Sequence, residues 1–152
     1  MHDTKLPIID YKADLVVIGA GSGGLSAAAG AAMFGLKVVL YEKHEMGGDC
    51  LNYGCVPVDS QERFEGLGVT VIREAASFAD PDTIISATTR TRARRIVIAT
   101  GSTAFIPPIE GLAETPYLTN ETLFSMPDFP EHLVILGGGP IGMEMAQAFT
   151  RL

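Results

Sequence analysis

The stretch "VVIGAGSGGLSAAAGAA", residues 16–32, decides the fold that we expect for this chain. Its first three residues are the end of a mainly apolar run over residues 14–18. This run is followed by glycines, which is typical of a buried parallel strand. The alanine-rich part that follows predicts a helix over residues 25–34, stopped by Gly35. Residues 37–41 predict a second buried strand. This order of strand, glycine turn, helix and strand predicts an α/β fold with a right-handed crossover.

The glycines of this stretch have the spacing G-x-G-x-x-G. Gly19 permits the tight turn, Gly21 lets a pyrophosphate approach the backbone, and Gly24 lets the helix pack close to the sheet. The free amides at the start of the helix attract phosphate charge. Glu42 ends the second strand, about 20 residues further on, where a carboxylate can accept hydrogen bonds from both ribose hydroxyls of an adenosine. The spacing and its context predict a dinucleotide site.

A second stretch, "VILGGGPIGMEMAQAF" at residues 134–149, repeats the pattern. Gly137, Gly139 and Gly142 keep the same spacing after a predicted strand over residues 132–136. We expect the residue that chooses between NAD and NADP to follow Leu152, so this choice stays open.

The part between the two glycine turns has a different pattern. Short strands separated by turn residues predict a small antiparallel β-meander in this part. An apolar strand, a helical turn and a final helix are then expected. The predicted ranges are 69–72, 77–79, 83–87 and 89–94 for the meander strands, 95–99 for the apolar strand, 120–124 for the turn and 141–152 for the helix.

Composition limits the classes of function. The chain has 152 residues, 47% of them hydrophobic, and a formal charge of -7, which argues against non-specific nucleic-acid binding. The basic cluster of Arg90, Arg92, Arg94 and Arg95 predicts the solvated face of a strand. Residues 15–36 carry no charge, but their many glycines favour a buried strand and helix over a membrane span. No export signal is recognisable, and we expect a cytoplasmic protein without membrane partners.

The chain contains two cysteines, Cys50 and Cys55. Residues five apart in an ideal helix have Cα atoms about 8.6 Å apart, whereas a disulfide needs less than about 7 Å. A bridge would therefore require a distorted turn, and a strained bridge is easier to reduce, as catalysis requires. Two alternatives to a disulfide stay open. The cysteines could bind a metal ion together with His44 or Asp49, or they could be two unrelated buried thiols.

The segments "VVIGAGSGG", "GGDCLNYGCVP", "IVIATGS" and "VILGGGPIGMEMA" occur in the order found in the pyridine nucleotide-disulfide oxidoreductases. The chain resembles this family, which includes glutathione reductase, dihydrolipoyl dehydrogenase and mercuric reductase, over most of its length. The cysteine segment is most similar to the last two. The resemblance implies a Rossmann-like FAD-binding domain with a parallel sheet and the meander, and then the start of a second Rossmann-like unit for NAD(P).

The resemblance also assigns roles to residues. It implies that Cys55 lies against the flavin, where it forms a charge-transfer complex, and that Cys50 attacks the substrate. Electrons would pass from NAD(P)H through FAD to the Cys50–Cys55 disulfide and then to a small-molecule disulfide, a dihydrolipoyl group or a metal ion. The positions implied for FAD are Gly19, Gly21, Ser22, Gly23, Gly24, Glu42, Lys43, Gly48, Asp49, Thr100 and Gly101, and those for NAD or NADP are Gly137, Gly139 and Gly142.

The chain departs from the family pattern after Pro57. Val58 and Asp59 stand where the family has a serine and a lysine near the flavin, and the following residues resemble a later part of the family sequence. We therefore expect an internal deletion near residues 57–60, an incomplete FAD-binding domain over residues 1–129, and a truncated NAD(P)-binding unit over residues 130–152.

Full-length members of the family are expected to be homodimeric NAD(P)H:disulfide or mercuric oxidoreductases. For this chain alone we expect no turnover, because the family's ribityl-binding turn and dimerisation domain belong to the carboxy-terminal half. A dinucleotide-binding module without redox work and a non-catalytic remnant are the alternatives.

Overall fold

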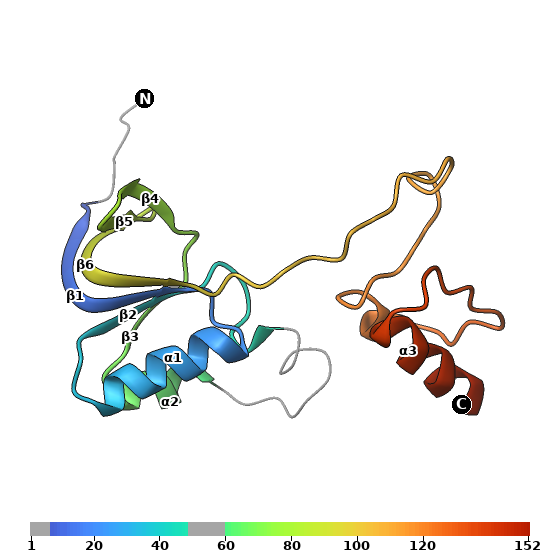
Figure 1. Ribbon diagram of the computed structural model, residues 1–152, viewed down its shortest axis with the longest axis horizontal. Coiled ribbons are helices and arrows are strands. Elements are labelled where there is room, and N and C mark those ends of the chain that lie inside the picture. The colour runs from blue at the N-terminus through green and yellow to red at the C-terminus, as the bar shows by residue number, and fades with distance from the viewer. Residues whose placement is uncertain (1–6, 49–59) are drawn as a thin grey trace. The chain divides into compact units, whose positions relative to one another are not determined.

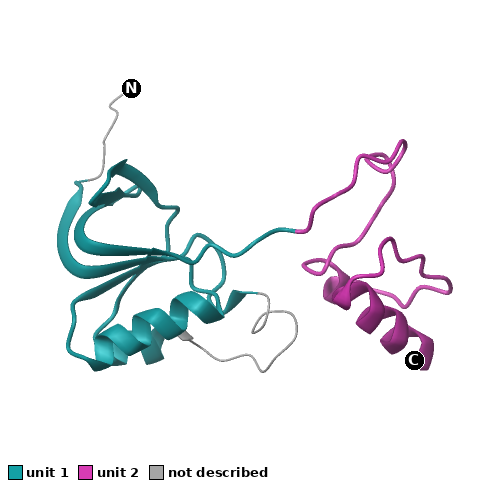
Figure 2. Cartoon of the chain, in the orientation of Figure 1, with its two compact units in different colours: residues 1–103 teal, residues 104–152 magenta. Residues whose placement is uncertain are grey.

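The computed structural model describes residues 7–48 and 60–152. The chain forms two compact units, residues 1–103 and residues 104–152 (Figure 2). Within the described residues, the elements of the first unit are a sheet and the two helices named below, and those of the second are a helical turn and one helix. The elements are β1 (Ile9–Ile18), α1 (Ser22–Met33), β2 (Val38–Tyr41), α2 (Ser60–Gly66), β3 (Thr70–Ile72), β4 (Ser77–Asp80), β5 (Thr83–Ile85), β6 (Thr89–Ile98), η2 (Leu123–Ser125) and α3 (Pro140–Arg151).

The six strands of the first unit form one sheet in the order β3-β2-β1-β6-β5-β4 (Figure 1). Strand β1 lies parallel to β2 on one side and to β6 on the other, and β2 lies parallel to β3. Strands β4, β5 and β6 are antiparallel neighbours. This mixed sheet confirms the α/β fold with a parallel part and a small antiparallel meander.

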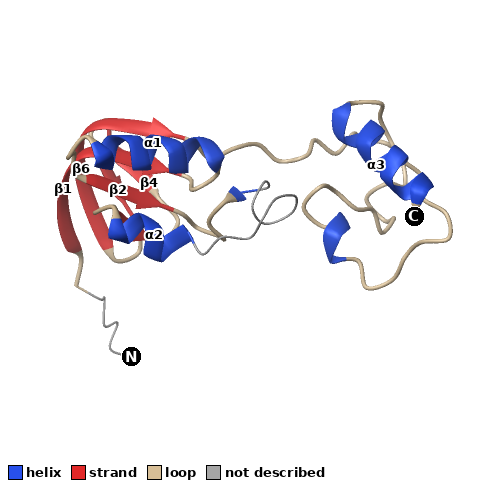
Figure 3. Cartoon of the chain, turned by 90° about the horizontal axis from the view of Figure 1, so that it is seen from below, coloured by secondary structure: helices blue, strands red, loops and turns tan. Residues whose placement is uncertain are grey.

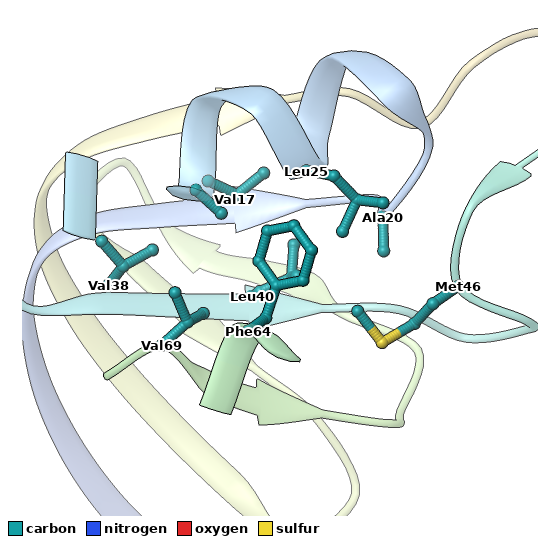
Figure 4. Packing of buried hydrophobic residues seen from close by; sticks show 9 residues of the cluster. Val17, Ala20, Leu25, Val38, Leu40, Met46, Phe64 and Val69 are labelled. Atoms are coloured by element: carbon teal, nitrogen blue, oxygen red, sulfur yellow. The ribbon is translucent and has the colours of Figure 1, made fainter. Parts of the chain in front are cut away.

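Both faces of β2 and of residues 15–18 of β1 are buried or half-buried, which explains the continuous apolar runs of these two strands. On one face, Val17 and Leu40 pack with Leu25 of α1 and Phe64 of α2, which point into the same cluster in Figure 4. Figure 3 shows these two helices side by side over the strands. On the other face, Val16, Val39 and Tyr41 pack with Ile84 of β5, whose side chain is completely buried. The meander therefore covers the face that the helices leave open.

Helix α1 begins three residues before the predicted start, directly after the glycine turn. Its buried residues are Gly24, Leu25 and Ala28, so two of these three positions carry no side chain larger than a methyl group. Small residues at the contact let the helix axis approach the strands closely. This places the first helical turn beside the carboxyl end of β1.

Two strand predictions for the first unit were wrong in detail. Residues 69–72 were expected in the meander, but β3 pairs parallel with β2, because its apolar residues extend the buried sheet edge. Residues 89–94 and 95–99 were expected as separate strands, but β6 is continuous. Its first part pairs with both β1 and β5, which gives one strand two partners along its length.

The strand predicted for the second unit is not found in the structure. Residues 132–136 are irregular, and no strand of the described chain pairs with them. A single strand has no partner for its backbone hydrogen bonds and does not form by itself. Helix α3 matches the predicted helix, yet it has no buried residue. The predicted helical turn is present as η2, a short 3-10 helix.

The charged and apolar stretches singled out in the sequence lie as expected. Arg90, Arg92, Arg94 and Arg95 are all exposed. The first three alternate along one face of β6, as predicted, whereas Arg95 follows Arg94 directly and therefore belongs to the other face. The uncharged residues 15–36 are divided between the end of β1 and the whole of α1. None of the helices in the described ranges is long and apolar enough to cross a membrane.

Candidate functional site

Three chain segments meet at one edge of the parallel sheet. Strands β1, β2 and β6 end at Ile18, Tyr41 and Ile98, and because they are parallel their carboxyl ends lie at the same edge. The backbone N–H of Gly19 donates to the oxygen of Tyr41 at 2.8 Å, and that of Ala99 donates to the oxygen of Ile18 at 2.7 Å. Ligands of open α/β sheets bind at such an edge.

The turn after β1 requires glycine at two positions. Gly19 has φ +100°, and a Cβ there would lie 2.3 Å from the backbone oxygen of Ala99. A Cβ on Gly24 would lie 1.9 Å from the oxygen of Gly19 and 3.3 Å from the Cβ of Ala99. The turn, the start of α1 and the end of β6 are therefore packed backbone against backbone.

The start of α1 is open to an anion. Gly21 is the N-cap residue, no side chain caps the helix, and its first turn carries no acidic residue. The first amides of a helix have no intrahelical acceptor and lie at the positive end of the dipole. A Cβ on Gly23 would meet nothing within 4 Å, so the approach to the backbone is free. These features fit the pyrophosphate of a dinucleotide.

The loop after β2 lies against the glycine turn. The N–H of Gly47 donates to the oxygen of Ala20 at 2.7 Å, and Gly21 and Gly47 form an isolated parallel bridge. Gly48 has φ +59°, and a Cβ on it would lie 3.0 Å from the Cα of Gly21. The loop that leads towards the cysteine segment therefore passes directly beside the predicted phosphate site.

Glu42 connects the same two segments through its side chain. Its Oε2 accepts a hydrogen bond from the N–H of Ala20 at 2.7 Å. Its Oε1 accepts one from the N–H of His44 at 2.8 Å. Each carboxylate oxygen retains a second lone pair, so the group can also accept from ribose hydroxyls.

The structure brings most of the predicted FAD residues of the first unit to this edge. Lys43 is exposed beside Glu42, and Gly101 has φ +70° with an open environment. Asp49, Cys50 and Cys55 lie outside the described residues, as do Val58 and Asp59. The residues found at the edge of the sheet are Gly19, Gly21, Ser22, Gly23, Gly24, Glu42, Gly48 and Thr100.

Sequence reasoning missed three residues of this edge, namely Ala20, Gly47 and Ala99. Ala20 is fully buried and provides both a donor to Glu42 and an acceptor for Gly47. Ala99 is the residue against which Gly19 packs. The Gly47-Gly48 pair was a usable signal, because paired glycines mark a close approach of two backbones. Ala20 and Ala99 have no such signal.

The second glycine turn belongs to the other unit. Gly137 has φ +105°, Gly139 is the N-cap residue of α3, and a Cβ on Gly142 would lie 2.5 Å from the oxygen of Gly137. The backbone of this turn therefore has the form expected for a phosphate-binding turn. Its predicted strand is the part that does not form.

Neither of the two prominent cavities includes the glycine turns. One, of about 330 Å³, lies beside β6 and is lined by Phe78, Arg94 and Arg95. The other, of about 560 Å³, lies in the second unit and is lined by Phe129, Ile135 and Phe149, among others. Within residues 7–48 and 60–152, no group of three acidic, histidine or cysteine side chains is arranged to hold a metal ion.

Comparisons with known proteins agree with this geometry. A family model described as pyridine nucleotide-disulphide oxidoreductase matches residues 13–152. The mercuric reductase of Streptomyces lividans is 32% identical over an alignment of 192 residues, which covers 91% of this chain and 40% of that protein. The dihydrolipoyl dehydrogenase of Acholeplasma laidlawii is 27% identical, over 90% of this chain and 56% of that protein.

Solved structures give the same result. The HOCl-induced flavoprotein disulfide reductase RclA from Escherichia coli aligns with a TM-score of 0.75 and 28% identity, over 90% of this chain and 39% of that one. A structure of RclA as a Cu(II) complex aligns with a TM-score of 0.74 and 29% identity, over 89% of this chain and 39% of that one. The chain spans about two fifths of the length of these proteins.

Proposed function

The chain belongs to the pyridine nucleotide-disulphide oxidoreductase family, and from this premise we propose that its first glycine turn binds the pyrophosphate of FAD. One observation supports the proposal above all others. The uncapped start of α1, the carboxylate of Glu42 and the end of β6 lie together at the carboxyl edge of the parallel sheet. This edge is where α/β sheets bind nucleotides.

The described residues divide the work of binding. The amides of Ser22 and Gly23 face the phosphate charge, and the missing side chain of Gly21 lets it approach. Glu42 accepts from the ribose hydroxyls, and its negative charge disfavours a 2'-phosphate. Lys43, Gly48 and Asp49 border the adenosine and the flavin, while Thr100 and Gly101 approach from the end of β6. FAD, when bound, supplies the exchange of electrons between a nicotinamide and a dithiol.

For the complete enzyme we propose that Cys50 and Cys55 form the redox-active disulfide, with Cys55 beside the flavin and Cys50 facing the substrate. Gly137, Gly139 and Gly142 bind NAD or NADP. The substrate is a small-molecule disulfide, a dihydrolipoyl group or a metal ion, and the names of the relatives include enzymes for each of the last two classes. The enzyme is a cytoplasmic homodimer in this proposal.

For this chain alone we propose binding without turnover. Its alignment with the Streptomyces mercuric reductase is longer than the chain itself, which supports an internal gap, and we place that gap near residues 57–60. In this proposal residues 1–129 form the FAD-binding domain, and residues 130–152 form the start of the NAD(P)-binding domain.

A titration of the full chain with FAD, followed by the visible spectrum, tests the proposal. A Cβ on Gly21 would be 4.0 Å from the Cα of Gly48, so Gly21→Ala folds and places a methyl group on the phosphate path. Gly30→Ala is the matched control, because a Cβ there meets nothing within 4 Å in the same helix. We expect Gly21→Ala to weaken FAD binding about tenfold or more, as the loss of a charge-assisted hydrogen bond does, and Gly30→Ala to leave it unchanged.

Equal binding by the two variants, or no binding by the parent chain, would contradict the proposed site. Addition of NADH or NADPH to the FAD complex separates the alternatives. Bleaching of the flavin absorbance indicates a working redox module, whereas an unchanged spectrum indicates a binding module without redox work.

A further inference from the structure

The side chain of Glu42 is held by two backbone hydrogen bonds within the chain. Both of its oxygens accept backbone N–H groups, from Ala20 at 2.7 Å and from His44 at 2.8 Å. The two donors belong to different segments, since Ala20 lies inside the glycine turn and His44 lies in the loop after β2. Hydrogen bonds from backbone amides to a carboxylate are stronger than bonds between neutral groups.

The same two segments also meet through their backbones. The N–H of Gly47 donates to the oxygen of Ala20 at 2.7 Å. Ala20 is completely buried, so both its N–H and its carbonyl oxygen are committed to the region after β2. Beyond this pair, Gly21 and Gly48 approach closely, and a Cβ on Gly48 would make a tight contact of 3.0 Å with the Cα of Gly21. The glycine turn and the loop after β2 are thus joined at two places. Glu42 joins them through its hydrogen bonds, and Gly21 and Gly48 join them by their close approach.

We propose that Glu42 is a positioning residue, which holds the phosphate turn and the loop of residues 43–48 in their binding arrangement in the absence of cofactor. The inference rests on the proposed function and adds a second role to the ribose contact. A ligand that meets a preorganised turn does not have to order the turn on binding, so preorganisation increases affinity. The effect reaches the phosphate end of the ligand, which a ribose contact alone does not touch.

The two roles predict opposite results for a ligand without ribose. Inorganic pyrophosphate has no hydroxyl for Glu42 to accept from, and its negative charge is repelled by the carboxylate. If Glu42 served only the ribose, its removal would leave pyrophosphate binding unchanged or make it tighter. If Glu42 holds the turn, its removal weakens pyrophosphate binding in spite of the lost repulsion.

The experiment uses the full chain with Glu42→Gln and Glu42→Ala, and Glu74→Gln as the control. Both carboxylate oxygens of Glu74 also accept hydrogen bonds, one from the N–H of Thr88 at 3.0 Å and one from the hydroxyl of Thr88. Glu74 lies in the meander region, and these two bonds do not involve the glycine turn. Amide hydrogen exchange of Ala20 and His44, measured without ligand, reports the two bonds directly. Calorimetric titration with inorganic pyrophosphate then measures the affinity of the glycine turn for phosphate charge.

In Glu42→Ala we expect exchange at both amides to increase about tenfold to a hundredfold, as the loss of hydrogen bonds to a charged group predicts, and pyrophosphate binding to weaken. Glutamine has one acceptor oxygen and is expected to protect one amide. Glu74→Gln is expected to leave Ala20, His44 and pyrophosphate binding unchanged.

Unchanged exchange at Ala20 and His44 in Glu42→Ala would overturn the inference. Increased exchange together with unchanged or tighter pyrophosphate binding would also overturn it, because the bonds would then be structural only. Failure of the parent chain to bind FAD contradicts the proposed function instead, and the exchange measurement distinguishes that case because it requires no ligand.

Discussion

The two glycine turns of this chain have almost the same backbone but different surroundings. Gly19 and Gly137 have φ of +100° and +105°. The N-cap residues Gly21 and Gly139 have φ of -72° and -74°, with ψ of 179° and 174°. The local sequence is therefore sufficient to set the course of the backbone, even where no sheet supports it.

The surroundings separate the two turns. A Cβ on Gly19 would strike the backbone of Ala99, whereas one on Gly137 would meet nothing within 4 Å. Strand β1 before the first turn is paired on both sides, while residues 132–136 before the second are unpaired. Segments distant in the sequence therefore pack against the first turn, whereas residues 132–136, which precede the second turn, pair with no strand of the described chain.

The largest expected effect tests this difference directly. Alanine at either Gly19 or Gly137 adds left-handed strain of about 1–2 kcal/mol. Gly19→Ala also forces the Ala99 backbone away, which brings its total loss in the free energy of unfolding to about 3 kcal/mol. Gly137→Ala is expected to lose about 1 kcal/mol. Urea denaturation followed by far-UV circular dichroism measures both, and equal losses would contradict the comparison.

A smaller effect is expected inside the sheet of the first unit. The hydroxyl of Tyr41 is hydrogen-bonded to Thr89 Oγ1 at 2.9 Å and to Thr91 Oγ1 at 2.6 Å, in a buried position. Tyr41→Phe leaves the two threonine hydroxyls without this partner, so we expect the free energy of unfolding to fall by about 2 kcal/mol. Tyr117→Phe is the control in the second unit, where Tyr117 is 44% exposed. A change of less than about 0.5 kcal/mol is expected there, and the same denaturation curves decide.

The smallest effect depends on pH. Hydrogen bonds from the hydroxyls of Ser86 and Thr88 hold the pKa of Glu74 below its usual value. Because the folded-state pKa is lowered, the carboxylate stabilises the fold above the usual pKa of about 4.3. That contribution is lost as the pH falls through the folded-state value. Glu74→Gln is therefore expected to be less stable than the parent at neutral pH and to approach it in acid.

Thermal unfolding at several pH values measures this difference. Glu114→Gln removes the same charge from an exposed position in the second unit and serves as the control. A gap between Glu74→Gln and the parent that stays constant from neutral pH into acid would contradict the assignment.

Patterns within short stretches predicted most of the fold. The glycine spacing and the apolar runs predicted β1, β2, α1, α3 and the two turns, because strand and helix periodicity are local properties. Residues 69–72 were assigned to the wrong part of the sheet, because an apolar strand carries no mark of which neighbour it pairs with. Residues 132–136 have the composition of a strand, but a strand also needs a partner.

The candidate site was predicted in the same uneven way. Glu42 was identified from its distance along the chain to the glycine turn, and the structure places it beside that turn. That its carboxylate already holds Ala20 and His44 was not predictable, since backbone amides look alike in any sequence. The same is true of Ala99, whose importance comes only from its closeness to Gly19.

The sequence by itself determined where this chain turns, which residues lack a side chain at those turns, and which carboxylate follows the second strand. These are local properties, because backbone angles and hydrophobic periodicity depend on near neighbours. Only the tertiary structure decided which turn is packed against other segments and which groups Glu42 holds. Pairing between distant segments depends on the free energy of packing the whole sheet, and no short stretch contains that information.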